Sequence, residues 1–451
     1  MRVAIKTLGC RQNQCESDAL QESLRRDGHT AVSPDEAADL FIINTCSVTQ
    51  EADADSRQMI RRAIRRNPSA RVVVTGCYAQ IAAGEIAAIP GVVLVAGNGE
   101  KAQLPELISS LREQSRPLIA VSDIQQSTRF APLPPPVGAA RSRALLKVQD
   151  GCSYRCTFCI VPETRGPNRS QSTDAVLRDL RVLVDAGYPE VVLTGTHLGT
   201  YGRDLPTDSS IAGLVADMLE AAAPARLRLS SLDPHEAGEE LIGCFGRFGN
   251  LCRHLHLPVQ SGDETVLKRM RRPHTADDFR RLVERLAEAV PGIAIGTDVI
   301  VGFPGEGDAE FEQTYRLLDR LPIAYLHVFS YSQRKGTVAA SMSDQVPKDV
   351  RAARSAALRA LSDAKWRAFR QTQVGQSFAA VVLEGRDTRT GRLDALTDNY
   401  ITVRVEHAEE SVGRMVVLSV EAVTERETIG CLHMRCANDV IPTPEEKWAR
   451  A

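Results

Sequence analysis

The sequence predicts an α/β protein with three domains: an N-terminal parallel-sheet α/β domain, a central partial barrel of six βα units, and a small C-terminal antiparallel β-barrel. Short apolar runs alternate with helix-forming segments near the N-terminus, and the same rhythm resumes after a proline-rich stretch. The final third of the chain ends in β-rich segments with no helix between them. A chain of 451 residues has room for about three such domains.

The first domain is expected at residues 1–120. The run VAIKTLGC leads into SDALQESLRRDG, where Ser17 is the expected N-cap of a helix and Gly28 its expected end. DLFIINTC and RVVVTGC are two more apolar runs, each followed by a helix-forming segment. Near-continuous apolar strands separated by helices are typical of a buried parallel sheet.

Three cysteines follow these apolar runs. Cys10, Cys46 and Cys77 each come at the end of an expected strand. The carboxyl ends of parallel strands lie at one edge of a sheet, where ligands bind in such folds. We therefore expect the three thiols to converge, although they are far apart in the sequence.

Residues 121–143 are expected to form a linker, because three successive prolines are followed by glycine and small residues. The central domain should then span residues 144–368. A helix capped by Ser172 and ended at Gly187 should connect its first two strands. The chemistry of a partial (β/α)6 barrel is expected at the carboxyl ends of its strands. The expected strands are ALLKVQD, EVVLTG, RLRLSSL, HLHLPVQ, IAIGTDVIVG and AYLHVFSYS.

The C-terminal β-barrel is expected at residues 369–436, followed by a loose tail at 437–451. The formal net charge of −2 argues against binding of polyanions by bulk charge, so a nucleic-acid partner would need local basic patches. The N-terminus has no hydrophobic leader and the sequence no membrane-length apolar run. We expect a cytoplasmic protein with no membrane contact.

The sequence DGCSYRCTFC places Cys152, Cys156 and Cys159 in one loop after the first strand of the central domain. Such closely spaced thiols usually hold a metal, and disulfides do not persist in a reducing compartment. The spacing suits a cluster with three thiolate-bound irons and one iron open to another ligand. The alternative is a zinc site completed by a remote cysteine or histidine.

This CxxxCxxC motif at the start of a partial barrel resembles the radical S-adenosylmethionine (SAM) enzymes. The resemblance implies a 4Fe–4S cluster whose open iron is chelated by SAM, and cleavage of SAM to a 5′-deoxyadenosyl radical. It assigns no catalytic side chain beyond the clusters and this radical. The stretches TGTHLG, RLSSLDP and GTDVIVGFPGE strengthen the likeness. The residues that it implies for SAM binding are Phe158, Gly195, Thr196, Ser230, Ser231, Gln260 and Asp298.

With the upstream motifs TLGCRQNQCES, NTCSVT and TGCYAQ, the chain is similar to the methylthiotransferase family over residues 1–436. This similarity implies that Cys10, Cys46 and Cys77 bind a second 4Fe–4S cluster that handles sulfur. Without it, the three would be interpreted as ordinary buried cysteines. The C-terminal barrel resembles the RNA-binding TRAM module. The five other cysteines are interpreted as structural: Cys15, Cys244, Cys252, Cys431 and Cys436.

The finer resemblance is to the branch of the family that acts on threonylcarbamoyladenosine beside the anticodon of tRNA. The expected partners are a tRNA anticodon stem-loop and an electron donor such as a flavodoxin or ferredoxin, with the enzyme as a monomer. Two basic runs could contact RNA phosphates or could be solvated faces only. They consist of Arg61, Arg62, Arg65 and Arg66, and of Lys268, Arg269, Arg271 and Arg272.

Other functions remain open at this stage. A methylthiotransferase could act on isopentenyladenosine in tRNA or on a ribosomal-protein aspartate. A protein of another class, a non-catalytic iron–sulfur redox sensor that binds RNA, would also keep the cysteines. Cleavage of SAM to 5′-deoxyadenosine separates the enzyme from the sensor.

Overall fold

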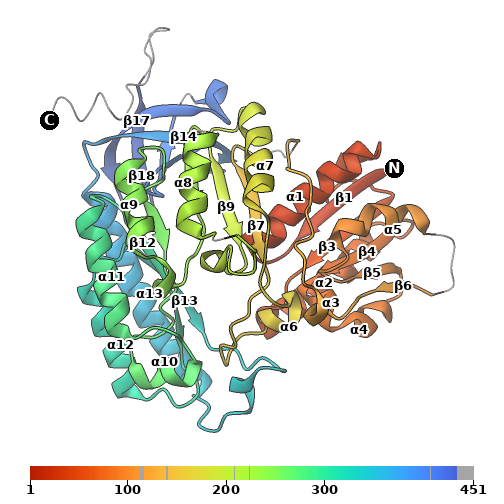
Figure 1. The fold of residues 1–451 in the computed structure, drawn as a ribbon, viewed down its shortest axis with the longest axis horizontal. Helices are drawn as coiled ribbons and strands as arrows, with labels where there is room; N and C mark the ends of the chain where they lie inside the picture. Colours follow the sequence, from red (N-terminus) through yellow and green to blue (C-terminus); the bar gives the residue numbers. More distant parts are fainter. Residues whose placement is uncertain (112–115, 139–140, 208, 223, 407, 434–451) are drawn as a thin grey trace.

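The computed structural model describes residues 1–433 except 112–115, 139–140, 208, 223 and 407. It contains an N-terminal α/β domain, a central partial barrel, and a C-terminal β-barrel that lies across one end of the central domain (Figure 1). This confirms the predicted fold class. Cys436 and the expected tail lie outside the described residues.

The N-terminal domain is built on a six-stranded sheet in the order β2-β1-β3-β4-β5-β6, with every pair parallel. The strands are β1 (Arg2–Thr7), β2 (Thr30–Val32), β3 (Leu40–Thr45), β4 (Arg71–Gly76), β5 (Val92–Ala96) and β6 (Leu118–Ala120). The helices are α1 (Arg11–Arg26), α2 (Gln50–Arg66), α3 (Cys77–Ile81), α4 (Ala83–Ala87) and α5 (Leu104–Ser110).

Both faces of this sheet are covered, as the continuous apolar runs predict. β3 is buried at all six positions. Leu40 and Ile42 pack with α1 and α5 on one face, and Phe41 and Ile43 pack with α2, α3 and α4 on the other. The alternation of strand side chains therefore divides one apolar run between two cores.

The expected N-cap at Ser17 is wrong. Helix α1 begins at Arg11 with Cys10 at the N-cap, and Ser17 lies inside the helix, where its hydroxyl accepts a hydrogen bond from Asn44. The polar start of α1 looks like loop in the sequence because its residues are buried against the central domain rather than exposed. The expected end holds: α1 stops at Arg26, and Gly28 has a φ of +81°.

The six predicted strands of the central domain are all present. They are β7 (Ala144–Asp150), β9 (Val191–Gly195), β10 (Leu227–Leu229), β11 (His254–His256), β12 (Ala294–Val301) and β13 (Tyr325–Ser330), with a short antiparallel β8 (Arg169–Ser170) beside β7. They form two parallel groups, β10-β9-β7 and β11-β12-β13, joined by a bridge between Leu227 and Leu251. The partial barrel is therefore confirmed.

Helices cover the outside of this barrel (Figure 1). They are α7 (Thr173–Asp185), α8 (Ile211–Ala221), α9 (Glu239–Arg247), α11 (Ala276–Ala289) and α12 (Asp308–Arg320). Two short helices lie elsewhere: α6 (Val161–Arg165) contacts α3 of the N-terminal domain, and α10 (Glu264–Met270) packs in a separate small apolar cluster. The predicted helix after Ser172 is α7, although the Ser172 side chain makes no capping hydrogen bond.

Helix α13 (Lys348–Gln371) packs along β13 and continues into the C-terminal barrel, so the expected boundary at residue 368 falls inside a helix. The barrel closes in the order β14-β15-β16-β18-β17, and only the β16–β18 pair is parallel. Its strands are β14 (Ser377–Arg386), β15 (Leu393–Thr397), β16 (Thr402–Val405), β17 (Met415–Val423) and β18 (Thr428–Leu432). Within the described residues, no helix is both long and apolar enough to span a bilayer.

Candidate active site

The N-terminal cysteine trio follows three neighbouring strands of the sheet. Cys10 comes after β1, Cys46 after β3 and Cys77 after β4, and these strands are adjacent in the order β1-β3-β4. Gly9 has a φ of +94°, and a Cβ atom there would lie 2.7 Å from both Cβ and Sγ of Cys46. The loop that carries Cys10 is thus pressed directly against Cys46, which confirms that the strand ends converge.

The thiols of this trio influence one another. Burial raises the pKa of Cys46 to about 11, and the neighbouring sulfurs of Cys77 and Cys10 contribute in the same direction. Asn98 points its amide nitrogen at the Cys77 sulfur from 3.7 Å. Buried thiols of this kind ionise when a metal supplies positive charge.

The second trio lies in the loop between β7 and α6. Within it, the Cys159 backbone N–H donates to the carbonyl of Cys156, and the Val161 N–H lies 3.4 Å from the Cys159 sulfur. The Cys152 N–H donates to the carbonyl of Gly166, which closes the loop at its base. Burial raises the pKa of Cys159 to about 12. One short segment therefore presents all three sulfurs.

The spacing of the sulfurs argues for a cluster rather than a single metal ion. Within the described part of the chain, neither trio has its three sulfurs within 4.8 Å of one another. A tetrahedral zinc ion with Zn–S bonds of about 2.3 Å holds its sulfurs about 3.8 Å apart. Three thiols at this wider spacing suit an iron–sulfur cluster better than a single zinc ion.

His197 and Glu236 face the Cys152 sulfur. His197 Nδ1 lies 3.3 Å from this sulfur, and its Nε2 lies 3.1 Å from a carboxylate oxygen of Glu236. Burial alone would lower the pKa of His197, but its contacts with Cys152 and Glu236 raise it to about 10. The ring is therefore a cation held between the carboxylate of Glu236 and the sulfur of Cys152.

A similar arrangement faces Cys156. Arg272 directs one guanidinium nitrogen to the Cys156 sulfur at 3.5 Å and forms an ion pair with Asp233. Burial alone would raise the pKa of Asp233, but hydrogen bonds from His235 and His274, together with Arg272, hold it far below its usual range. Such donors to cluster sulfurs are a means of setting the potential of an iron–sulfur centre.

A buried ionic hub centred on Glu16 joins the two trios. Glu16 of α1 forms ion pairs with Lys101, Lys147 and Arg165, and Arg165 also pairs with Asp150 at the end of β7. Burial alone would raise the pKa of Glu16, but its three cationic partners hold it well below its usual range. The hub therefore keeps its charges near neutral pH and locks α1 to the segment that follows the second trio.

Two asparagines strengthen this junction. Asn13, three residues after Cys10, accepts a hydrogen bond of 2.6 Å from Arg165. Asn98, which faces Cys77, donates a hydrogen bond of 2.7 Å to the carbonyl of Thr164 in α6. Hydrogen bonds thus join the segment after Cys10 and the residue that faces Cys77 to helix α6, which follows the second trio.

The residues expected to bind SAM come from the carboxyl ends of successive strands. Gly195 ends β9 and Thr196 follows it, Ser230 and Ser231 follow β10, and Gln260 comes four residues after the end of β11. The buried hydroxyl of Ser230 has no hydrogen-bond partner in the described structure, so it is free to bind a ligand. Thr196 is already engaged, since its hydroxyl donates to Asp150 at 2.9 Å.

Phe158, Gln260 and Asp298 lie in different settings. Phe158 is partly buried and, like Ile300, packs against a small apolar cluster that includes Val266 and Phe303. Gln260 has a φ of +69°, which is uncommon for a residue with a side chain. Asp298 lies within β12 and accepts hydrogen bonds from His256 at 2.8 Å and His327 at 3.2 Å, both on neighbouring strands. The side chain of Asp298 therefore faces the lumen of the barrel.

The two basic runs differ in exposure. Arg61, Arg62, Arg65 and Arg66 are all exposed on α2. In the second run, Lys268, Arg269 and Arg271 are exposed, and Arg269 also donates a hydrogen bond to the carbonyl of Pro304. The side chain of Arg272 is only 7% exposed, and it bonds Cys156 and Asp233. Arg272 therefore faces the cluster loop and not the surface.

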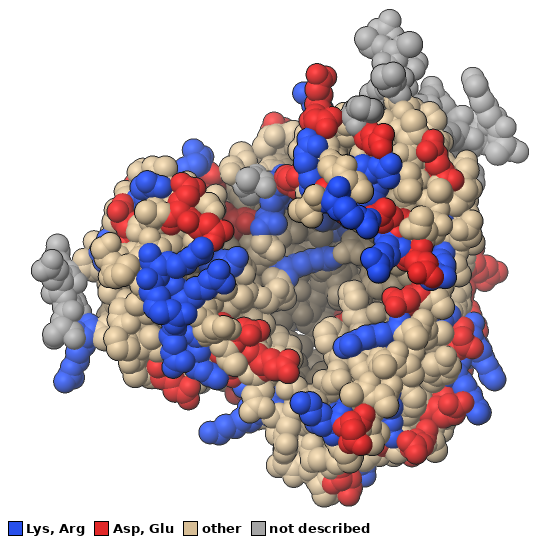
Figure 2. Space-filling view, turned by 180° about the vertical axis from the view of Figure 1, so that it is seen from behind, with Lys and Arg blue, Asp and Glu red and all other residues tan. Residues whose placement is uncertain are grey.

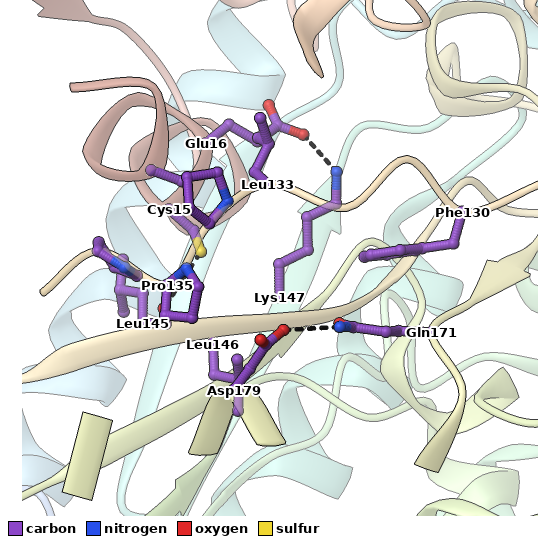
Figure 3. A pocket seen from close by; sticks show the side chains of 13 residues that line it. Cys15, Glu16, Phe130, Leu133, Pro135, Leu145, Leu146, Lys147, Gln171 and Asp179 are labelled. Atoms are coloured by element: carbon purple, nitrogen blue, oxygen red, sulfur yellow. Dashed lines mark hydrogen bonds and ion pairs between the residues drawn. The ribbon is translucent and has the colours of Figure 1, made fainter. Parts of the chain in front are cut away.

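The described cysteines outside the trios show contacts that suit packing. Burial raises the pKa of Cys15 to about 12, and its thiol contacts the carbonyl of Leu145 at 3.3 Å. Figure 3 shows Cys15 beside Pro135 and Leu133 of the expected linker, in a pocket that also contains Glu16 and Lys147. Cys244 and Cys252 are buried, and Cys431 is exposed on β18.

The sequence interpretation missed several residues of this site, among them Glu16, Arg165, His197, Asp233 and Glu236. Two signals were available: His197 directly follows Thr196 in TGTHLG, and the polar run DPHE begins two residues after Ser231. The Glu16–Arg165 pair had no local signal, because 149 residues separate its members.

A three-cysteine loop after the first strand of a partial barrel, with a second trio beside it, defines an iron–sulfur protein of the radical SAM class. Residues 146–318 match the radical SAM superfamily, and residues 2–97 match the uncharacterized protein family UPF0004. A solved radical SAM methyltransferase, TsrM from Kitasatospora setae, has the same fold, with a TM-score of 0.54 at 16% identity over 73% of this chain and 74% of that one.

Similar proteins of known function narrow the class of the chain within the radical SAM proteins. It is 40% identical to the threonylcarbamoyladenosine tRNA methylthiotransferase MtaB of Bacillus subtilis, over 93% of each chain. It is 36% identical to the MtaB of Aquifex aeolicus, over 92% of this chain and 99% of that one. The chain is 33% identical to a tRNA-2-methylthio-N6-dimethylallyladenosine synthase of Moorella thermoacetica, over 90% of this chain and 96% of that one. The chain belongs to the radical SAM methylthiotransferase family and is of the MtaB type.

Proposed function

We propose that this enzyme adds a methylthio group to C2 of threonylcarbamoyladenosine next to the anticodon of tRNA. The junction of the two cysteine trios carries this proposal, because sulfur delivery and radical formation must act on one substrate atom. The names of the relatives from Bacillus subtilis and Aquifex aeolicus supply the nucleoside.

The clusters and SAM, when bound, supply one-electron reduction, a methyl group and a 5′-deoxyadenosyl radical. The radical is needed because C2 carries only hydrogen, and hydride is too poor a leaving group for polar substitution. Cys152, Cys156 and Cys159 would hold the SAM-binding cluster. Cys10, Cys46 and Cys77 would hold the sulfur-handling cluster. The protein's own contribution is to fix the relative position of the two sites and to orient the substrate, which is a large part of catalysis in general.

Side chains near the second trio have separate tasks in this proposal. His197 and Arg272 place positive charge beside the sulfurs of Cys152 and Cys156. The free hydroxyl of Ser230 and the strand-end residues Gly195 and Thr196 bind SAM. Ser231, Gln260, Asp298 and Phe158 complete this pocket.

The exposed arginines of α2 would bind RNA phosphates, because such contacts supply most of the affinity for nucleic acid. Figure 2 shows basic side chains gathered on the lobe of the N-terminal domain, beside the hollow at the centre of the molecule. Lys268, Arg269 and Arg271 would extend the contact. The C-terminal β-barrel would act as a TRAM-like RNA-binding module. A flavodoxin or ferredoxin would reduce the clusters.

The domain limits are part of this proposal. Residues 1–120 would carry the sulfur-handling cluster, 144–368 the SAM chemistry and 369–436 the RNA-binding barrel. The linker 121–143 would hold the first two together, and the enzyme would act as a monomer.

The first experiment is nucleoside mass spectrometry of bulk tRNA from cells with and without this protein. We expect 2-methylthio-threonylcarbamoyladenosine to disappear when the protein is absent. Loss of the isopentenyl analogue instead would keep the chemistry and reject the substrate. If no tRNA nucleoside changes, a ribosomal-protein aspartate would be tested next. A reduced, reconstituted protein that yields no 5′-deoxyadenosine from SAM would be a sensor and not an enzyme.

A further inference from the structure

Three domains meet at the floor of the central barrel. The ring of Tyr400, from the turn between β15 and β16, stacks on His254 of β11 with ring centroids 4.2 Å apart. Arg11, the first residue of α1, donates a hydrogen bond of 2.6 Å to the Tyr400 hydroxyl. Tyr400 has a φ of +69°, a conformation that costs energy for a bulky residue and often marks a functional position.

Arg11 is available for a ligand at this floor. The residue is exposed, and its recorded partners are the hydroxyl and ring of Tyr400. Among the described residues, no carboxylate forms an ion pair with Arg11. In contrast, Arg228 and Arg226 beneath the floor are buried against Glu190.

The floor carries an excess of positive charge. Glu190 is the shared partner of three guanidinium groups, those of Arg143, Arg226 and Arg228. Burial lowers the pKa of His254 well below its usual value, and the charge of Arg228 and Arg11 adds to this effect, so His254 stays neutral. A neutral histidine and unbalanced cations suit an anionic group in this part of the lumen.

Above the floor, polar and aromatic side chains line one wall of the lumen. Tyr325, His327 and Phe329 occupy alternate positions of β13 and so share a face. His327 pairs in register with Asp298, and Phe329 pairs with Ile300. Ile300 packs against the same apolar cluster as Phe158, which lies between Cys156 and Cys159 in the sequence. Phe329 is 49% exposed. Exposed rings of this kind are platforms on which unpaired RNA bases stack.

Threonylcarbamoyladenosine matches both parts of this lumen. Its purine is a flat ring, and its threonine carries a free carboxylate, whereas a dimethylallyl group is uncharged. A guanidinium binds a carboxylate through two parallel hydrogen bonds. Resting on the proposed function, we propose that Arg11, oriented by Tyr400, binds the threonyl carboxylate and thereby selects this nucleoside over adenosines with a neutral N6 substituent.

The test compares two anticodon stem-loop RNAs that differ in one functional group. One carries threonylcarbamoyladenosine, and in the other the threonine is replaced by threoninamide, which removes the charge. The dissociation constant of each RNA is measured with the enzyme holding both clusters. We expect the wild type to bind the carboxylate RNA about 10- to 100-fold more tightly, the range of a hydrogen bond between charged groups.

The variants then assign this preference to Arg11. Arg11→Gln should reduce the ratio of the two dissociation constants to about one, and Arg11→Lys should keep part of it. Tyr400→Phe should lower the ratio about 3-fold, because the guanidinium loses its orienting hydroxyl. Arg62→Gln, on the exposed face of α2, is the matched control: it should weaken both RNAs equally and leave the ratio unchanged.

Two results would overturn the inference. A wild-type ratio near one would show that the carboxylate is not recognised, and this result needs no variant. Equal weakening of both RNAs by Arg11→Gln would show that Arg11 contacts something they share, such as a backbone phosphate. If the wild type forms no methylthio product on the threonylcarbamoyladenosine RNA, the proposed function fails instead. Iron content, measured for each variant, shows whether the substitution beside Cys10 has disturbed cluster loading.

Discussion

The two cysteine trios are assembled in opposite ways. The trio of Cys152, Cys156 and Cys159 lies within eight residues of one loop. The trio of Cys10, Cys46 and Cys77 is spread over 68 residues and exists only because three parallel strands lie side by side. The first trio is a local property of the sequence, whereas the second is a property of the folded sheet. Perturbing the N-terminal domain should therefore separate the two sites.

The largest effect is expected from removing a ligand of either trio. Cys156→Ala should abolish cleavage of SAM to 5′-deoxyadenosine, and with it methylthiolation. Cys46→Ala should keep SAM cleavage and lose methylthiolation. Both products are measured by mass spectrometry with the reconstituted enzyme. Methylthiolation by Cys46→Ala would contradict the division of tasks between the trios, and Cys15→Ala serves as a control that should keep both activities.

The next largest effect should come from Gly9, where a methyl group would displace the Cys46 side chain. Gly9→Ala is expected to prevent loading of the N-terminal cluster, so that iron content falls from about eight to about four per chain. Gly28→Ala is the matched control, because Gly28 also has a positive φ but has nothing within 4 Å of the added methyl. Equal iron content in the two variants would show that contact with Cys46 does not limit loading.

Breaking the hub around Glu16 should loosen the contact between the domains. Glu16→Gln leaves buried cations without a counter-charge, which typically costs about 3 kcal/mol of unfolding free energy. The exposed Arg280–Glu284 pair is the control, and Glu284→Gln should cost about 0.5 kcal/mol or less. Urea unfolding measures both. Similar costs for the two variants would mean that the hub does not hold the domains together.

The hub should also make stability depend on pH. The pKa of Glu16 is depressed in the folded protein from an ordinary value of 4.5, so its contribution is fully present above pH 4.5 and is lost as the pH falls below it. The difference in unfolding free energy between wild type and Glu16→Gln should therefore be constant from pH 7 to 5.5 and shrink at pH 4. If this difference in unfolding free energy grew on acidification, the pKa of Glu16 would be raised by folding and not lowered.

The smallest effect concerns the two basic runs. Neutralising Arg62 and Arg66 together should weaken RNA binding and lower the slope of log affinity against log salt by about two, since each phosphate contact contributes about one unit. Arg272→Gln should change SAM cleavage while leaving this slope unchanged, because its side chain faces Cys156. A reduced salt slope of RNA binding for Arg272→Gln would show instead that Arg272 contacts an RNA phosphate.

These differences also explain how far the sequence could be interpreted. The strands, the barrels and the convergence of Cys10, Cys46 and Cys77 follow from apolar runs and from the geometry of parallel sheets, which are local rules. The start of α1 was missed because Asn13 and Glu16 are polar yet buried. Their partners include residues of the central domain that are distant in the sequence, so no local sequence pattern predicts that Asn13 and Glu16 are buried.

The same limit applies to Arg272. Its neighbours in the sequence are basic, a pattern that predicts an exposed face. The Arg272 side chain is buried nevertheless, because it forms an ion pair with Asp233, which lies 39 residues earlier. Long-range ion pairs of this kind determine which members of a charged run face solvent. The rest of the run, with Lys268 and Arg271 exposed, agrees with the simple pattern.

The position of Tyr400 has a consequence for how the enzyme is made. A ribosome synthesises the N-terminal domain and the central barrel before the turn that carries Tyr400, and domains generally fold in the order in which they emerge. Until that turn arrives, the lumen lacks part of its floor and Arg11 lacks its hydroxyl partner. A nascent or truncated chain could thus fold both cysteine trios and still have an incomplete nucleoside pocket. Completion of this floor is therefore a late step in the synthesis of the polypeptide.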